Sequence, residues 1–391
     1  MALRPDQPAH PETRVVHTGV YQDHQYRSVT TPIYTTSTFA FEDLNTPPKF
    51  DYTRSGNPTR EALQDNLCSL EGGLAAFSTV TGMAAIHTVL MTLNSGDHVI
   101  TGHEVYGGTH RLLSQVLPRM GIAVSFVDLT EPEQIENAVL SNTRLIWFET
   151  PTNPLLNIID MEAVVAVARR HGLLTAIDNT FLTPLLQRPF DFGVDIVVHS
   201  TTKYLNGHSD ALGGAIIVKD EALAKSVGFL VNALGTGSAP FDSWLVLRGV
   251  KTLSLRLAAA QNNAIRLAEW LSTHPRVRRV FYPGLVDHPG HQLASRQQRG
   301  FGGMLSFEVD DGVVDVAAFF KALSLFNLCV SLGGVESLIE QPWTMSHLAM
   351  PEAARRAAGI TPGLIRLSAG IENNDDLIAD LDQAFGIASR H

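Results

Sequence analysis

The sequence predicts an α/β fold with a large, mostly parallel sheet domain and a smaller α+β C-terminal domain. Helix-like and strand-like stretches alternate from about residue 61 to 240, which is typical of parallel strands joined by crossover helices. Beyond that point strand-like runs are separated by helical ones, which suits a smaller α+β domain. We expect an N-terminal arm over 1–60, a large domain over 61–245, and a linking helix with the C-terminal domain over 246–391.

Each expected element rests on a local pattern. Residues 1–60 are rich in Thr, Pro, Ser and Tyr without sustained periodicity, so they should form an extended arm on the fold or on a neighbouring subunit. In the large domain we expect helices over 60–73, 82–93, 110–121 and 160–172, and strands over 97–102, 123–129, 144–150, 173–180, 194–200 and 213–219. Further on we expect helices over 243–274, 351–359 and 375–388, and strands over 276–284, 302–309, 325–334 and 363–372.

Composition narrows the function classes. The chain has 391 residues, of which 45% are hydrophobic, and a formal net charge of −10, which argues against nucleic acid or an anionic membrane as its partner. Only Cys68 and Cys329 are present, and the N-terminus has no apolar leader, so we expect a cytoplasmic protein without a disulfide framework. No apolar run approaches the ~20 residues that span a bilayer.

Several expected strand ends carry polar groups. Asn153, Asp178 and Lys203 each follow a strand, and Ser200 and Thr202 accompany the lysine. Each has an ordinary explanation as a turn residue, a helix cap, a backbone binder or a solvated charge. Together they place an acid, a lysine, hydroxyls and an amide at the edge of a sheet where ligands bind in α/β folds.

A second feature is the stretch TVTGMAAIHTVL, which begins a helix at Gly82 after Thr79 and Thr81. The free N–H groups of a helix start attract anions such as phosphate, although a Thr-Gly start is more often only a cap. The sequence has neither GxxxxGK[ST] nor a GxGxxG after a strand, so no nucleotide motif claims this anion. Lysine, carboxylate and phosphate donors are together the parts of a pyridoxal phosphate site.

The same residues carry a family resemblance. From about residue 14 to 388 the chain resembles the Cys/Met-metabolism class of pyridoxal-phosphate enzymes, which includes cystathionine γ-synthase, cystathionine γ- and β-lyases, and methionine γ-lyase. The resemblance implies the aspartate aminotransferase-like fold type I. Eight stretches match in the family's order: YTRSGNPTR, TGMAAI, YGGTHR, ETPTNPLL, DNTF, HSTTKYLNGHSD, SLGGVESL and IRLSAGIE.

The resemblance implies a role for each matching residue. Lys203 would be the Schiff-base lysine, Asp178 the partner of the pyridine nitrogen, and Tyr106 the ring that stacks on the cofactor. The other implied cofactor residues are Thr180, Ser200, Thr202, the backbone of Gly82 and Met83, and Tyr52 with Arg54 from a neighbouring subunit, which implies a homotetramer of dimers that share active sites. The implied substrate residues are Asn153, which also contacts the ring hydroxyl, Arg366 on the substrate carboxylate, and Ser331, Glu336 and Arg111.

Within the family, we expect γ-replacement on an O-acylated homoserine with cysteine as acceptor, giving cystathionine for methionine biosynthesis. The alternative is cleavage of cystathionine to cysteine, 2-oxobutyrate and ammonia. SLGGVESL with Glu336 resembles the γ-synthases and γ-lyases more than the β-lyases. Gly107-Gly108 stands where methionine γ-lyases carry a cysteine beside the tyrosine, and Ser346 before His347 departs from the usual MTH stretch.

Two interpretations compete with this one. STTK fits the S-x-x-K pattern of penicillin-recognising enzymes with Ser200 as nucleophile, but 209–211 and 251–253 read SDA and KTL where S-D-N and K-T-G are needed. A non-enzymatic scaffold leaves the clustered polar strand ends unexplained. HEVYGGTH lacks HExxH spacing and there is no CxxC, so no metal site is expected.

Overall fold

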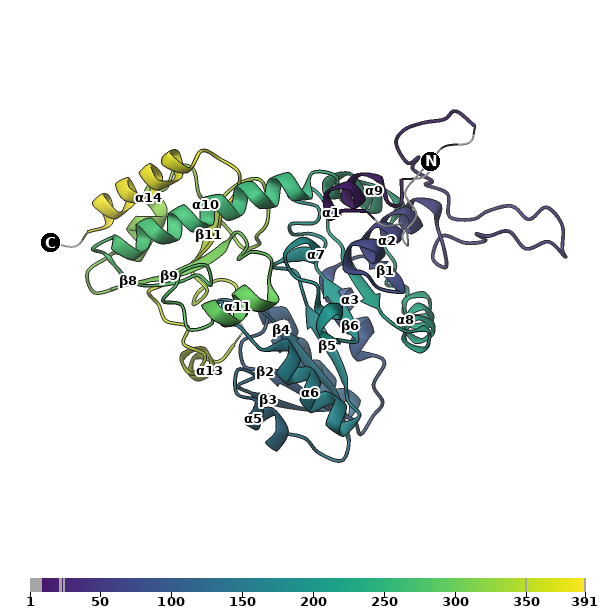
Figure 1. The fold of residues 1–391 in the computed structure, drawn as a ribbon, viewed down its shortest axis with the longest axis horizontal. Coiled ribbons are helices and arrows are strands. Elements are labelled where there is room, and N and C mark those ends of the chain that lie inside the picture. Colours follow the sequence, from purple (N-terminus) through teal and green to yellow (C-terminus); the bar gives the residue numbers. More distant parts are fainter. Residues whose placement is uncertain (1–8, 21–22, 24, 349, 390–391) are drawn as a thin grey trace. The chain divides into compact units, whose positions relative to one another are not determined.

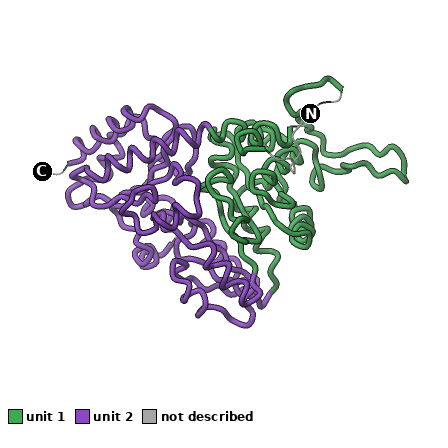
Figure 2. Tube along the Cα trace, viewed as in Figure 1, with its two compact units in different colours: residues 1–94, 174–254 green, residues 95–173, 255–391 purple. Residues whose placement is uncertain are grey.

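The computed structural model of the protein describes residues 9–20, 23, 25–348 and 350–389. Residues 1–8, 21, 22 and 24 of the predicted arm lie outside the described residues. The chain forms two compact units, one of residues 1–94 and 174–254 and one of residues 95–173 and 255–391, which Figure 2 colours separately. Among the described helices, none is long and apolar enough to cross a membrane.

The first unit is built on four strands in the order β1-β7-β6-β5. Strands β5 and β6 pair in parallel, whereas β7 is antiparallel to both β6 and β1. The elements of this unit are α1 (Pro11–His17), α2 (Pro58–Glu71), β1 (Ala75–Thr79), α3 (Gly82–Leu90), β5 (Leu174–Asp178), α7 (Thr183–Leu186), a 3-10 turn (Pro189–Phe192), β6 (Ile196–His199), β7 (Gly214–Val218), α8 (Glu221–Leu234) and α9 (Pro240–Val250).

Local sequence explains the bounds of α2, the helix that leads from the arm into this unit. The side chain of Asn57 accepts hydrogen bonds from the backbone N–H groups of Thr59 and Arg60, and Pro58 occupies the first helical position. The helix ends at Gly72, whose φ of 79° is easily adopted only by glycine. Its last residue, Glu71, is therefore held at a fixed place in the core, where it is fully buried.

Residues 25–57, ahead of α2, have little regular structure and project from the other parts of their unit as a long loop (Figure 1). Thr38 and Tyr52 form an isolated antiparallel bridge within this segment. Helix α1 was not predicted from the sequence. It is tied to α2 by Arg14, whose Nη1 donates to the hydroxyl and carbonyl oxygens of Ser69 at 2.6 and 3.0 Å.

The second unit contains three parallel strands in the order β4-β2-β3, and a five-stranded sheet in the order β10-β11-β12-β9-β8. Its first segment holds β2 (His98–Gly102), α4 (Gly107–Arg111), a π turn (Leu112–Val116), a 3-10 turn (Leu117–Met120), β3 (Ala123–Val127), α5 (Pro132–Asn137), β4 (Thr143–Glu149) and α6 (Met161–His171). Its second segment, with α10 starting at the unit boundary, holds α10 (Leu253–Thr273), β8 (Val277–Phe281), α11 (His291–Gln297), β9 (Met304–Val309), α12 (Val316–Ala322), β10 (Asn327–Leu328), β11 (Leu338–Glu340), α13 (Glu352–Ala357), β12 (Leu364–Ser368) and α14 (Asn374–Ala388).

One hydrophobic core holds the five-stranded sheet against its helices. Leu267 of α10, Phe319 of α12 and Phe385 of α14 are buried together with Phe307 of β9. Phe319 and Phe385 lie 4.7 Å apart between ring centroids. This packing fixes β12, the strand that carries Arg366, between β11 and β9.

The structure corrects three sequence expectations. The predicted helix over 110–121 is a short α-helix followed by π and 3-10 turns, because Pro118 cannot continue an α-helical ladder. The predicted strand over 325–334 shrinks to Asn327–Leu328. Strand β7 runs antiparallel because the loop after β6 returns directly, without a crossover helix. The expected domain division at 60 and 245 stays a prediction.

Candidate active site

The loop after β6 fixes the position of Lys203. The Lys203 N–H donates to the Ser200 carbonyl at 3.2 Å, and its own carbonyl accepts from Gly207 N–H at 2.8 Å. The Thr202 hydroxyl accepts from Gly213 N–H at 3.0 Å, which ties the two ends of the loop together. Lys203 is half-buried and its charge acts on Asp178. The structure thus brings Lys203 and the predicted acid into one neighbourhood.

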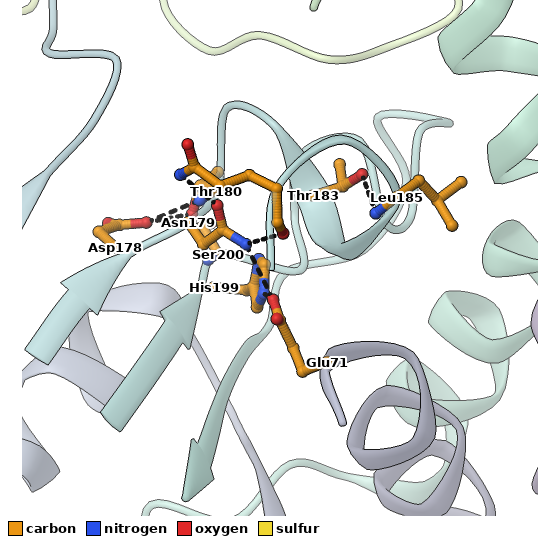
Figure 3. Close-up of polar contacts among 9 residues, drawn as sticks. Glu71, Asp178, Asn179, Thr180, Thr183, Leu185, His199 and Ser200 are labelled. Carbon is orange, nitrogen blue, oxygen red and sulfur yellow. Dashed lines mark hydrogen bonds and ion pairs between the residues drawn. The ribbon is translucent and has the colours of Figure 1, made fainter. Parts of the chain in front are cut away.

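Asp178, Thr180 and Ser200 form a chain of hydrogen bonds across the ends of β5 and β6 (Figure 3). Oδ1 of Asp178 accepts from the Thr180 hydroxyl at 2.5 Å and from the Thr180 N–H at 3.0 Å. The same hydroxyl oxygen accepts from the Ser200 N–H at 2.8 Å. Thr180 therefore fixes the distance between the predicted pyridine partner and the predicted phosphate donor.

Burial raises the pKa of the Asp178 carboxyl above its usual range. The hydrogen bonds from Thr180 and the positive charges of His199 and Lys203 oppose that rise. A cation placed against this carboxyl would favour its ionised form still further. Asp178 is therefore suited to hold a proton on a basic nitrogen beside it.

The start of α3 lies against Ser200. Thr81 caps the helix by accepting from the Ala84 N–H, which leaves the first N–H groups, those of Gly82 and Met83, at an end that attracts anions. A Cβ atom at Gly82 would lie only 2.9 Å from the Ser200 Cβ and 3.0 Å from its Oγ. Only glycine at position 82 lets the helix start approach the serine this closely, so backbone and hydroxyl donors converge there.

In the second unit, Arg366 of β12 is buried with a defined orientation. Its Nη1 donates to Asn153 Oδ1 at 3.0 Å and lies 3.0 Å from Glu340 Oε1, and its Nη2 donates to the Ser331 carbonyl at 2.9 Å. These contacts with described residues use three of the five guanidinium N–H donors. A guanidinium held in this way can present its other donors to a carboxylate in bidentate geometry. The structure thus brings together three of the predicted substrate residues: Arg366, Asn153 and Ser331.

Ser346 and His347 extend this cluster. The Ser346 hydroxyl donates to Glu340 Oε1 at 2.6 Å and lies 2.8 Å from His347 Nδ1. Burial, together with the nearby charge of Arg366, lowers the pKa of His347 to about 4, so its imidazole is neutral at pH 7. Serine and threonine both carry a hydroxyl. Ser346, which stands where the usual MTH stretch has threonine, can therefore donate this hydrogen bond to Glu340.

Tyr106 precedes α4 with 43% of its surface exposed. Gly107 follows it so close to the Ser346 segment that a Cβ atom there would lie 2.6 Å from the Ser346 carbonyl oxygen. Glu104, two residues before Tyr106, accepts hydrogen bonds from the Thr152 hydroxyl at 2.6 Å and from Asn157 Nδ2 at 2.8 Å. These contacts tie the Tyr106 loop to the turn that carries Asn153.

Besides Tyr106, four predicted site residues are exposed in the structure: Tyr52, Arg54, Arg111 and Glu336. The guanidinium of Arg54 lies 5.4 Å from the centre of the Tyr52 ring, and its Nε donates to Asn232 Oδ1 at 3.2 Å. Their predicted roles stay predictions. In the described part of the chain no three His, Cys, Asp or Glu residues are grouped so as to hold a metal ion.

Comparison with known proteins decides the class. A family model described as "Cys/Met metabolism PLP-dependent enzyme" matches residues 12–386. The chain belongs to this family. Pyridoxal phosphate is therefore its cofactor, which speaks against the S-x-x-K interpretation of the STTK stretch, and the role of Lys203 stays a prediction.

Relatives in this family carry several activities in their names. Cystathionine beta-lyase of Lactococcus lactis subsp. cremoris (strain MG1363) is 47% identical over 95% of this chain and 98% of its own. The crystal structure of cystathionine gamma synthase from Xanthomonas oryzae pv. oryzae in complex with cystathionine has a TM-score of 0.95 and 47% identity, over 97% of this chain and 98% of that one. Cystathionine gamma-lyase from Lactobacillus plantarum, complexed with L-serine, has a TM-score of 0.95 and 44% identity over 97% and 99%. The fold is that of the α/β pyridoxal-phosphate enzymes of trans-sulfuration.

The residues of the first unit fit the cofactor. The close approach of Gly82 to Ser200 makes a cradle of donors that suits a phosphate, and Asp178 suits a pyridine nitrogen. The sequence indicated these residues. It gave no indication of the buried Glu71, Asn179 and His199 behind them, or of Glu340 beside Arg366, because each looks like an ordinary helix, turn or strand residue until the chain folds.

Proposed function

We propose that this enzyme catalyses γ-replacement, joining cysteine to an O-acylated homoserine to give cystathionine. The observation that carries the proposal is the buried Arg366, whose orientation by Asn153, Glu340 and the Ser331 carbonyl supports the binding of an α-carboxylate. The exposed carboxylate of Glu336, on the segment between Ser331 and β11, supports recognition of a second, cationic amino group. Cystathionine has an amino-acid group at each end, so it fits both features.

Pyridoxal phosphate, when bound, supplies a ring that accepts electrons from the substrate carbon. Asp178 keeps the proton on the pyridine nitrogen, with Thr180 holding the carboxylate in place. Ser200, Thr202 and the N–H groups of Gly82 and Met83 hold the phosphate. In the second unit Asn153 orients Arg366, and the roles of Tyr106 and Asn153 toward the ring and its hydroxyl are those that the family resemblance implies.

Lys203 carries the proton transfers. Its amine would attach to the cofactor aldehyde in the resting enzyme. Once released, it would carry the protons of Cα and Cβ and return them to those carbons, while the proton of the cysteine thiol balances the acyl carboxylate that leaves Cγ. The half-buried position of Lys203, whose charge acts on Asp178, supports this role. The rigid loop would keep the amine within reach of both carbons.

Cleavage of cystathionine is the second candidate. Relatives named as β-lyase, γ-lyase and γ-synthase are 47%, 44% and 47% identical to this chain, so identity does not separate the three activities. Cleavage at the γ-carbon would give cysteine, 2-oxobutyrate and ammonia, whereas cleavage at the β-carbon would give homocysteine, pyruvate and ammonia. Methionine cleavage is disfavoured, because the cysteine that methionine γ-lyases carry beside the tyrosine is replaced by Gly107, where a Cβ atom would lie 2.6 Å from the Ser346 carbonyl oxygen.

One side-by-side assay separates these reactions. The purified enzyme is given O-succinylhomoserine with cysteine, and in parallel cystathionine alone, and both keto acids and both thiols are quantified. We expect kcat/KM for cystathionine synthesis to exceed that for either cleavage. A larger value for breakdown would overturn γ-replacement, and the keto acid formed would identify the lyase.

We also propose a homotetramer built from dimers that share active sites, with Tyr52 and Arg54 reaching the phosphate of the neighbouring protomer. The exposure of both residues on the projecting segment supports this role. Mixing an Arg54→Ala variant with a Lys203→Ala variant should restore about a quarter of wild-type activity, because a hybrid dimer contains one intact site. Failure to regain activity after subunit exchange has been verified by mass spectrometry would refute the sharing of sites.

A further inference from the structure

A buried acid and a buried histidine lie directly behind the cofactor residues of the first unit (Figure 3). Oε1 of Glu71 is 2.5 Å from Nε2 of His199, and the two side chains are 0% and 1% exposed. A contact this short requires a hydrogen atom between Glu71 Oε1 and His199 Nε2, so the two side chains are joined by a hydrogen bond. None of the roles derived above for the cofactor or the substrate uses this pair.

The position of the pair in the chain links it to the cofactor site. Glu71 Oε1 also accepts from Asn179 Nδ2 at 2.9 Å. Asn179 follows Asp178 directly, and His199 directly precedes Ser200. One oxygen atom of Glu71 therefore holds the neighbours of both the predicted pyridine partner and the predicted phosphate donor.

The other carboxylate oxygen of Glu71 and the other ring nitrogen of His199 indicate that the pair does more than stabilise the fold. Within the described residues, Glu71 Oε2 and His199 Nδ1 meet no hydrogen-bond partner although both are buried. Leaving buried polar atoms unpaired costs stability, and buried ion pairs are seldom more stabilising than apolar side chains of the same size. An arrangement that is poor for stability alone calls for another explanation.

We propose that Glu71 and His199 form a positioning pair for the pyridoxal phosphate site, in which Glu71 holds His199 and Asn179 in place and His199 favours the ionised form of the nearby Asp178 carboxyl. The proposal deepens the cofactor site and does not depend on which substrate the enzyme uses. Burial raises the pKa of Asp178, and the positive charges that oppose this rise are those of His199 and Lys203. Glu71 would thus act on the cofactor only through His199 and Asn179.

Two variants test the pair, each with cofactor affinity measured by equilibrium dialysis of the apo-protein across a range of pH. Glu71→Gln keeps an oxygen acceptor but removes the carboxylate, and His199→Gln keeps a donor near the Nε2 position but cannot be positive. We expect each to weaken cofactor binding about tenfold, as for the loss of one charge-assisted contact. Because the pKa of Asp178 would rise, binding should also be lost at a higher pH as the solution is acidified.

Asp195→Asn is the matched control. Asp195 Oδ2 accepts from the Thr175 N–H at 2.8 Å and from its hydroxyl at 2.7 Å, and so joins the same two strands at their opposite ends. It should lower the melting temperature without changing cofactor affinity or its pH dependence. If Glu71→Gln does not fold, His199→Gln decides by the same measurements. Wild-type affinity and pH dependence in a folded variant, or an equal effect of Asp195→Asn, would overturn the proposal.

Discussion

Replacing Lys203 with alanine is expected to lower kcat at least about a thousandfold, whichever trans-sulfuration reaction the enzyme runs. General acid–base catalysis by one positioned side chain contributes roughly 10²–10⁴-fold, and this lysine would also supply the amine that attaches to the cofactor aldehyde. The hydroxyls of Ser200 and Thr202 and the start of α3 are unchanged in this variant. Some cofactor should therefore remain bound through its phosphate.

The measurements are turnover on both substrate sets and the cofactor content after dialysis. Lys219→Ala is the control in the same unit, because the Lys219 amine donates to the Phe190 carbonyl at 3.0 Å and has no part in the proposed site. That variant should retain wild-type turnover. Full activity of Lys203→Ala would sink the assignment of the catalytic amine.

The candidate cofactor residues could be named from the sequence because they cluster in short stretches, and their roles stay predictions. HSTTK places three of them within four residues, and DNTF places two more after the neighbouring strand. In an α/β sheet the carboxyl ends of such strands meet at one edge, so sequence order alone brings Asp178 and Ser200 together. The Thr180 hydroxyl then joins them directly.

Glu71 and Glu340 could not be predicted because their roles depend on long-range contacts. Glu71 ends an ordinary helix and looks like one of its solvated acids, yet it meets His199, 128 residues further along the chain. Glu340 ends a three-residue strand and meets Arg366 only through the antiparallel pairing of β11 with β12. No local sequence pattern indicates that either carboxylate is buried.

The direction of β7 escaped prediction for a related reason. Alternating helices and strands favour a parallel sheet, but β6 and β7 are joined by a loop that contains Lys203 and no helix. A connection without a crossover helix can only return antiparallel to the same edge. The loop that carries the lysine therefore spans one end of two adjacent strands, where the hydrogen bonds between Thr202 and Gly213 close it.

The second large effect on activity is expected at Arg366, the residue proposed to bind the substrate carboxylate. Arg366→Lys should lower kcat/KM by about 10- to 100-fold, mainly through a higher KM for the amino-acid substrate. A lysine keeps the positive charge beside the buried Glu340 but cannot form two parallel hydrogen bonds to a carboxylate. A hydrogen bond to a charged group contributes about 1.5–3 kcal/mol, and each 1.4 kcal/mol corresponds to a factor of ten.

Arg366→Lys is a sharper test than Arg366→Ala, because alanine would leave the Glu340 carboxylate buried without its cation and could unfold the unit. The matched control is Arg356→Lys, since Arg356 pairs with Glu352 on the exposed face of α13 at 2.8 Å and should tolerate the change. The melting temperature distinguishes a loss of substrate binding from a loss of stability, because a variant impaired only in binding the carboxylate melts close to the wild-type temperature. An unchanged KM in a folded Arg366→Lys enzyme would mean that the substrate carboxylate is bound elsewhere, and the cluster of Asn153, Glu340 and Ser346 would then need another role.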